Sequence, residues 1–274
     1  MAQRAGLDRR STCWNPPRSD GKNPRSAGGS DLTQILLFAL AGFVAQLIDG
    51  SMGMAFGIVG TTIMLGMGIA PATASASVHA AEVFTTACSG LSHWRVGNVQ
   101  WRLVAALAIP GSIGGIIGAY VLTSLPSDTI RIGISLYLVA MGLWIIARGT
   151  FGKPSRPAAT HWVPVLGLGG GFLDAIGGGG WGPLVTSTLL GQGGVPRYTI
   201  GSVCLSEFFV TTSISLTFLF TIGLELWPII AGLMIGGAIA APIAALAAKH
   251  VPERPMLIAV GTVLTLISAR RLFL

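Results

Sequence analysis

Long apolar segments separated by short polar stretches dominate the chain from residue 32 onward. We expect helices over residues 32–48, 54–65, 72–92, 103–125 and 130–147, and then over 162–176, 184–190, 198–222, 227–248 and 256–273. A helix needs about 20 residues to cross a hydrocarbon core of roughly 30 Å, since it rises about 1.5 Å per residue. Most of these segments approach that length, so the pattern predicts an all-α, polytopic membrane protein.

The two shortest segments each follow a glycine-rich interruption. FLDAIGGGGWGP, residues 172–183, contains four consecutive glycines, and QLIDGSMGMAFG, residues 46–57, is a degenerate counterpart. Each glycine inside a helix costs about 1 kcal/mol relative to alanine, so four together break the helix. A new helix can start afterwards, because Pro183 is tolerated in a first turn. Each half therefore has two short or broken helices, forming a hairpin, plus three full transmembrane helices.

The two halves match each other along their length. Gly42 begins a stretch that matches the one at Gly171, at an offset of 129 residues, whereas Glu82 matches Glu207 at an offset of 125. Each half has five crossings, or three if the hairpin is re-entrant. Because both counts are odd, the halves must have opposite orientations, which predicts two inverted repeats. We divide the chain into a basic tail (1–31), repeat 1 (32–148), a linker (149–160) and repeat 2 (161–274).

Composition supports a lipid bilayer as the surroundings. The chain is 51% hydrophobic and only 10% charged, whereas soluble domains are near 25% charged. The net charge is +7, but six of the 17 Lys and Arg residues lie in the first 25 positions and most others border apolar segments. Basic residues flank membrane spans in this way, so we expect no nucleic-acid partner.

The N-terminal tail and the basic loops indicate which residues are disordered and how the protein is oriented in the membrane. Residues 1–31 are polar and lack periodicity, so we expect them to be disordered. The loop arginines and lysines favour both termini outside, although the basic tail argues for the opposite orientation. The three cysteines have no metal-ligand spacing and indicate no disulfide framework.

The breaks are candidate anion sites. Helices that restart after Gly53 and Gly182 would present unpaired backbone N–H groups and a partial positive charge, which bind anions without a charged side chain. The alternative is that these glycines only allow helices to pack closely. The candidate substrate-binding residues lie at or beside the breaks: Gly50, Ser51, Met52, Gly53, Gly177, Gly178, Gly179, Gly180, Trp181, Gly182, Thr186 and Ser202.

A polar stripe runs along one face of the third expected helix, with members spaced by three or four residues: Ser75, His79, Glu82, Thr86, Ser89 and His93. Acids inside membrane spans are costly and normally face a bundle interior or an aqueous cavity. Glu82 and Glu207 therefore either carry a coupling proton or hold the hairpins. An aspartate before each break can cap a helix. The residues with coupling or hairpin-support roles are Asp49, His79, Glu82, Asp174, Cys204 and Glu207.

The sequence gives little indication of catalysis. It contains no HExxH, GxSxG or P-loop motif, so we expect neither an enzyme nor a cofactor. His79 and Glu82 could form half of a metal pair, but the second half offers Cys204 and Glu207 without another histidine. We therefore expect no metal site, and an intramembrane enzyme remains a remote alternative.

Four motifs resemble the sulfite exporter TauE/SafE family: QLIDGSMGMAFG, PATASASVHAAEVFTT, GGFLDAIGGGGWGPLVTSTLL and GSVCLSEFFVTT. The resemblance covers about residues 35–273, although the first break lacks the four-glycine form. It implies inverted repeats and movement of a small sulfur-containing anion, such as sulfite or a sulfonate, across the cytoplasmic (inner) membrane of a bacterium. It also implies that the protein has no ATPase of its own.

We therefore expect a secondary transporter that works by alternating access. The alternatives are an anion channel and a non-transporting membrane scaffold. The sequence leaves open the particular anion, the direction of transport, the coupling ion and the oligomeric state.

Overall fold

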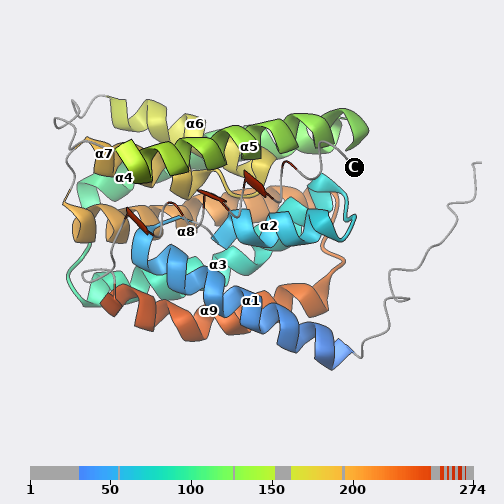
Figure 1. Cartoon of the computed structure of the whole chain (residues 1–274), viewed down its shortest axis with the longest axis horizontal. Helices are drawn as coiled ribbons and strands as arrows, with labels where there is room; N and C mark the ends of the chain where they lie inside the picture. Colours follow the sequence, from blue (N-terminus) through green and yellow to red (C-terminus); the bar gives the residue numbers. More distant parts are fainter. Residues whose placement is uncertain are drawn as a thin grey trace, which may run out of the picture.

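A computed structural model describes residues 31–54, 56–125, 127–151, 162–192 and 195–247, with isolated helical positions between 254 and 269. The described elements are α1 (Asp31–Met52), α2 (Phe56–Gly66), α3 (Pro71–Arg95), α4 (Trp101–Ser124), α5 (Ser127–Phe151), α6 (Val163–Gly177), the π-helix η3 (Gly182–Thr186), α7 (Ser187–Gly191), α8 (Pro196–Thr221) and α9 (Trp227–Ala247). They lie roughly alongside one another in a single elongated bundle (Figure 1).

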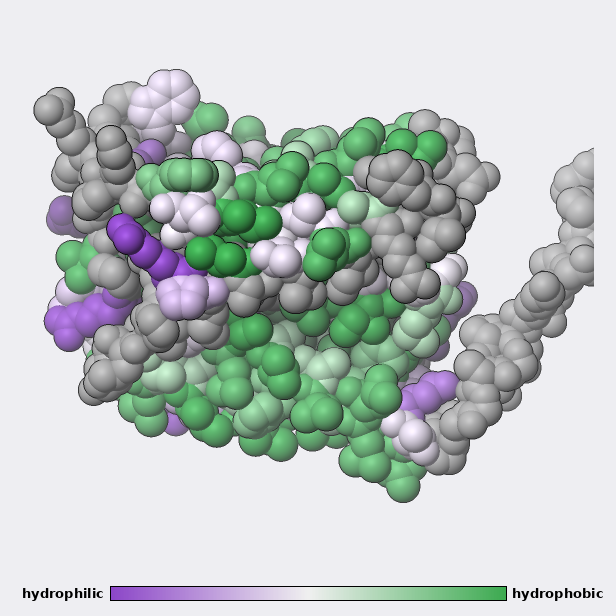
Figure 2. All heavy atoms as spheres, viewed as in Figure 1, coloured by the Kyte–Doolittle hydropathy of each residue, from purple (hydrophilic) through white to green (hydrophobic). Residues whose placement is uncertain are grey.

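Four of these helices are long and apolar enough to cross a membrane: Leu32–Ser51, Trp101–Ser124, Arg197–Thr221 and Trp227–Ala247. The face in Figure 2 carries a broad hydrophobic area between hydrophilic patches at the two ends of the bundle. Helix α3 is as long, with 25 residues, but its polar stripe is buried among its neighbours. The predicted fold class, an all-α polytopic membrane protein, is confirmed.

Both predicted interruptions are present. Helix α1 ends at Met52 and α2 begins at Phe56, while α6 ends at Gly177 and the next helical segment begins near Gly182. α1 runs four residues past its expected end at Ile48, and α5 continues to Phe151, into the expected linker. The tail before Asp31, most of that linker and most of the last expected helix, 256–273, lie outside the described residues.

The closest helix pairs join the two halves of the sequence. A methyl group on Gly42 of α1 would lie 2.5 Å from the Leu233 carbonyl oxygen of α9. A methyl group on Gly118 of α4 would lie 2.5 Å from the Phe172 carbonyl oxygen of α6. Small residues allow backbones in membranes to approach this closely. The α1–α9 and α4–α6 pairs are therefore each made of one helix from either half.

Helices α3 and α8 lie at the centre. α3 packs on both α9 and α8, and α8 also packs on α4. An α1–α3–α9 group and an α4–α6–α8 group thus meet where α3 contacts α8. At this contact Thr86 Oγ1 and Thr211 Oγ1 are 3.4 Å apart, and each hydroxyl donates to a glutamate carbonyl one turn earlier. Glu82 of α3 and Glu207 of α8 thus lie one turn before this contact on their own helices.

Candidate functional site at the paired helix breaks

Each break is formed by a glycine in a left-handed conformation. Gly53 has φ 71° and Gly178 has φ 65°, a region that glycine enters without steric cost. The Gly53 N–H donates to the Asp49 carbonyl, and the Gly178 N–H donates to the Asp174 carbonyl. These matched turns favour an offset of 125 residues between the breaks. The offset of 129 residues expected from aligning the two halves by residue identity exceeds this value by about one helical turn.

The two breaks are joined by a reciprocal pair of hydrogen bonds. The Thr61 hydroxyl of α2 donates to the Gly178 carbonyl at 2.7 Å, and the Thr186 hydroxyl of η3 donates to the Gly53 carbonyl at 2.6 Å. Thr186 follows Thr61 by the same 125 residues that separate Gly178 from Gly53. All four residues are buried, so each bond satisfies a carbonyl that no water can reach.

Glycines also bring the two backbones into direct contact. A methyl group on Gly57, in the first turn of α2, would lie 2.7 Å from Gly179 Cα and 2.8 Å from Glu82 Oε1. One on Gly182, at the start of η3, would collide with Met54. The first turn of each restarted helix therefore rests on the break of the other half, with no room for a side chain.

A buried cluster lies beside the second break, and we call His79, Glu82 and Asp174 the His79 cluster. Asp174 Oδ1 accepts the N–H groups of Gly180 at 2.8 Å and Trp181 at 3.0 Å. Its Oδ2 is 3.2 Å from His79 Nε2, and Glu82 Oε2 is 3.8 Å from the same nitrogen. Asp174 thus caps the restarted helix, and its carboxylate occupies two N–H groups predicted to bind an anion.

A corresponding cluster lies beside the first break, and we call Asp49, Cys204 and Glu207 the Cys204 cluster. One ligand atom from each of the three lies within 4.8 Å of the others, and all three residues are buried. The same holds for the three residues of the His79 cluster. Each cluster combines an aspartate from one half with two residues from the central helix of the other half.

The α3 stripe also supports both breaks. Near the second break the Ser75 hydroxyl donates to the Ala175 carbonyl at 2.7 Å. Near the first break His93 Nε2 donates to the Gly50 carbonyl at 2.9 Å, and Asn98 Nδ2 lies 3.3 Å from His93 Nδ1. The carbonyl groups freed where the helices end are therefore satisfied by α3 side chains, as a buried helix terminus requires.

Other predicted residues have different surroundings. The Ser51 hydroxyl donates to the Leu47 carbonyl within α1, and Met52 is the last residue of that helix. The Ser202 hydroxyl donates to the Tyr198 carbonyl and accepts the Gln100 N–H, so it anchors the loop between α3 and α4. These contacts place Ser202 at that loop, whereas Gly177 and the fully buried Trp181 lie at the second break.

Three residues at the site were missed in the sequence. Thr61 could have been found from its spacing to Thr186. The Tyr137 hydroxyl of α5 would lie 2.7 Å from a methyl group on Gly180. Gln46 is fully buried on α1, and no described group forms a hydrogen bond with its amide atoms. Tyr137 and Gln46 have no polar counterpart at the matching position of the other half, so the comparison of the halves did not identify them.

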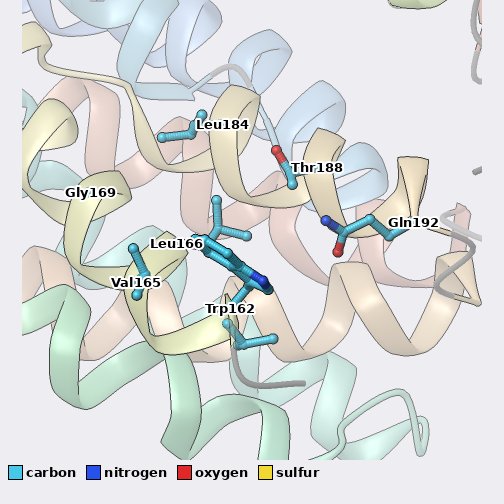
Figure 3. A pocket seen from close by; sticks show the side chains of 8 residues that line it. Trp162, Val165, Leu166, Gly169, Leu184, Thr188 and Gln192 are labelled. Atoms are coloured by element: carbon cyan, nitrogen blue, oxygen red, sulfur yellow. The ribbon is translucent and has the colours of Figure 1, made fainter. Parts of the chain in front are cut away.

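A hollow of about 330 Å³ lies away from the breaks, between the start of α6 and the η3–α7 segment (Figure 3). Its lining is mostly apolar, with Trp162 and Leu166 from the α6 side and Leu184, Thr188 and Gln192 from the other side. None of the residues predicted to bind substrate lines it.

The helices and the buried polar breaks define a multi-pass membrane protein whose chemistry is concentrated between two interrupted helices. Residues 38–271 match the family described as "Sulfite exporter TauE/SafE", and the chain belongs to this family. It is also similar to the "Probable membrane transporter protein YtnM" of Bacillus subtilis (strain 168). The two are 44% identical over 251 residues, which cover 88% of this chain and 83% of that protein. The protein is thus a membrane transporter of the TauE/SafE type, as its motifs indicate.

Proposed function

We propose that the protein is a secondary transporter of a sulfite-like or organosulfonate anion in a bacterial cytoplasmic membrane. The observation that carries this proposal is the reciprocal pairing of the breaks through Thr61–Gly178 and Thr186–Gly53. It brings two helix starts to one buried place, where inverted repeats of secondary transporters bind their substrates. We read the matched contacts as those of two inverted repeats.

The N–H groups of Gly50–Gly53 lie in the last turn of α1, and those of Gly178, Gly180 and Trp181 already have acceptors. The anion would therefore be held by the remaining backbone N–H groups of the Gly177–Gly182 break, beside Thr186. A carboxylate next to an anion site would normally repel the substrate. Here Asp174 already receives two N–H groups and the His79 ring, so its charge is compensated. That arrangement also supports the anion-binding role, because an oxygen anion already sits at this helix start.

Alternating access would move groups of helices rather than whole repeats. Helices α1 and α9 come from different halves and are in backbone contact, as are α4 and α6. Motion of one repeat against the other would separate both of these pairs. We therefore assign the motion to the α1–α3–α9 group against the α4–α6–α8 group, with the glycine contacts between the breaks as the gate.

Flux into proteoliposomes tests the proposal. We expect uptake of sulfite, or of a sulfonate such as taurine or sulfoacetate, to depend on the protein and to proceed without ATP. Liposomes without protein give the background, and Gly57→Leu, which forces the breaks apart, gives a matched inactive protein. A lack of protein-dependent flux for every sulfur oxyanion and sulfonate would exclude the transport proposal.

An anion channel is the second candidate, because the breaks could also line a pore. A channel would give high-rate conductance in a planar bilayer, independent of any ion gradient. A transporter would show saturable flux that responds to the gradient of a coupling ion.

A further inference from the structure

The Tyr137 side chain of α5 lies directly on the second break. Its Cε1 atom would be 2.7 Å from a methyl group on Gly177, and its hydroxyl oxygen would be 2.7 Å from one on Gly180. Both glycines are buried, so a side chain at either position would take the space that the tyrosine fills. The two glycines therefore admit the ring and leave its hydroxyl at the start of the restarted helix, which η3 and α7 form together over residues 182–191.

The Tyr137 hydroxyl has no partner at this place. Its oxygen is buried, yet it forms no hydrogen bond with any described residue. Most buried polar side-chain atoms have a partner, because an unpaired one loses its hydration without compensation. A phenolic hydroxyl can donate one hydrogen bond. The molecule thus holds an unused donor against the second break.

The backbone of the break has an unused donor of its own. The N–H groups of Gly180 and Trp181 donate to Asp174 Oδ1. The Gly178 N–H donates to the Asp174 carbonyl. Gly179 lies between these residues and is buried, but its N–H donates to no described group. Two unpaired donors call for an acceptor, and the partial positive charge of a helix start favours one that is negatively charged.

We propose that Tyr137 is a binding residue for the transported anion, and that its hydroxyl donates a hydrogen bond to an oxygen of a sulfite or sulfonate held beside the Gly179 N–H. The inference rests on the proposed function, since it names a contact of the same anion. Asp174 already accepts from two N–H groups, which leaves the hydroxyl available to a second acceptor. Sulfite and sulfonates carry three oxygens, so one can accept from the side chain while another faces the backbone.

The first break lacks the corresponding donor. Helix α5 matches the expected helix 256–273, and the offset that aligns Pro126 with Pro252 places Val263 at the position of Tyr137. A valine side chain donates no hydrogen bond. The contact with the anion is therefore one-sided and belongs to the second break, although the two breaks pair with each other through matched residues.

A structural role is the competing explanation for the hydroxyl, and protein stability separates the two. If the hydroxyl supported the break itself, its removal would destabilise the protein in the absence of any ligand. If it serves a ligand, its removal deletes an unpaired buried group, and the ligand-free protein should be as stable as the wild type or more stable.

Tyr137→Phe tests the proposal, because it keeps the ring on Gly177 and removes only the hydroxyl. Thermal unfolding of the purified full-length protein would be followed during titration with sulfite and with sulfoacetate, and with chloride at equal ionic strength. We expect a saturable rise in the wild-type unfolding temperature with a sulfur anion, because a ligand of the folded state stabilises it. In Tyr137→Phe the apparent affinity should fall by roughly ten- to a hundredfold, the range for a hydrogen bond to a charged group.

Tyr120→Phe is the matched control, since Tyr120 of α4 is exposed and its loss should leave the affinity unchanged. In proteoliposomes, Tyr137→Phe should raise the half-saturating concentration of the anion by the same factor as the affinity falls. The ligand-free Tyr137→Phe protein should unfold at the wild-type temperature or above it.

Equal anion affinities of the wild-type and Tyr137→Phe proteins would overturn the role of Tyr137 and leave the proposed function intact. A lower unfolding temperature of the ligand-free variant, or its failure to fold, would assign the hydroxyl to the structure and would also overturn the proposal. An equal rise with chloride would reduce the response to a salt effect. A wild-type protein that neither binds nor transports any sulfur anion would refute the proposed function, and this inference with it.

Discussion

The Thr61 hydroxyl and the Gly178 carbonyl oxygen lie 2.7 Å apart, although 117 residues separate them in the chain. With its counterpart between Thr186 and Gly53, this bond holds the two breaks together in a region that water does not reach. The contact has a direct energetic consequence, because loss of either hydroxyl leaves a buried carbonyl unsatisfied.

Thr61→Val and Thr186→Val should therefore each destabilise the protein by about 1–3 kcal/mol, the cost of a buried unsatisfied polar group. For a chain of this size that corresponds to about 2–4 °C in unfolding temperature per kcal/mol. Thr150→Val is a suitable control, since this exposed hydroxyl bonds only within α5. It should change stability by less than about 0.5 kcal/mol. Equal effects at Thr61 and Thr150 would contradict the role of the bond.

Gly57→Ala should disrupt the contact between the breaks. Its methyl group would lie 2.7 Å from Gly179 Cα, and backbone cannot move aside as a flexible side chain can. We expect a loss of at least about 1–3 kcal/mol, typical of overpacking, together with loss of sulfur-anion flux. Gly169→Ala on α6 meets nothing within 4 Å and should be neutral or slightly stabilising. Wild-type flux in Gly57→Ala would show that the breaks do not need close contact.

Asp174→Ala should be more damaging than Asp174→Asn. Removal of the side chain leaves the Gly180 and Trp181 N–H groups without their acceptor and the His79 ring without its partner. Each buried group left without its partner in this way costs about 1–3 kcal/mol. Asparagine keeps one acceptor oxygen for the N–H groups, so part of the stability should remain. The unfolding temperatures of the two variants give the comparison, and equal values would argue against the capping role.

Glu82→Gln and Glu207→Gln should differ in transport, because only Glu82 has an imidazole beside it. We expect the Glu207 variant to lose dependence of flux on the coupling ion and the Glu82 variant to retain it. Initial rates measured across a range of Na⁺ concentrations and of pH would separate the two. If both variants keep the full pH dependence of the wild-type protein, neither glutamate carries a coupling proton and both serve the hairpins alone.

The sequence was sufficient to place the membrane helices among the described residues, the two breaks and the polar stripe, because each depends on a pattern within one element. Glu82 and Thr86 share a helical face whatever surrounds them. The partners across the molecule were not accessible in the same way. Nothing in the local sequence of Thr61 indicates the Gly178 carbonyl, and the apolar surroundings of Gln46 give no sign of a polar neighbour.

The position of the first break shows a second limit of aligning the two halves by residue identity alone. Gly42 resembles Gly171 in its flanking residues, which suggested an offset of 129, but the left-handed turns at Gly53 and Gly178 differ by 125. A four-residue difference is about one helical turn, so both alignments keep the same face of the helix. Only the backbone conformation distinguishes them. The hydrogen bond between the Ser202 hydroxyl and the Gln100 N–H was inaccessible for a related reason, since that N–H belongs to a distant loop.

The close contact between α1 and α9 also affects how the chain is made. A ribosome delivers α1 to the membrane first and α9 only after nearly 200 more residues, and domains generally assemble in the order of their synthesis. Until then the glycine surface around Gly42 has no partner, and Asp49 faces the bilayer without the helices that enclose it. During synthesis α1 therefore remains without its packing partner, and the final structure can form only once almost the whole chain has been inserted.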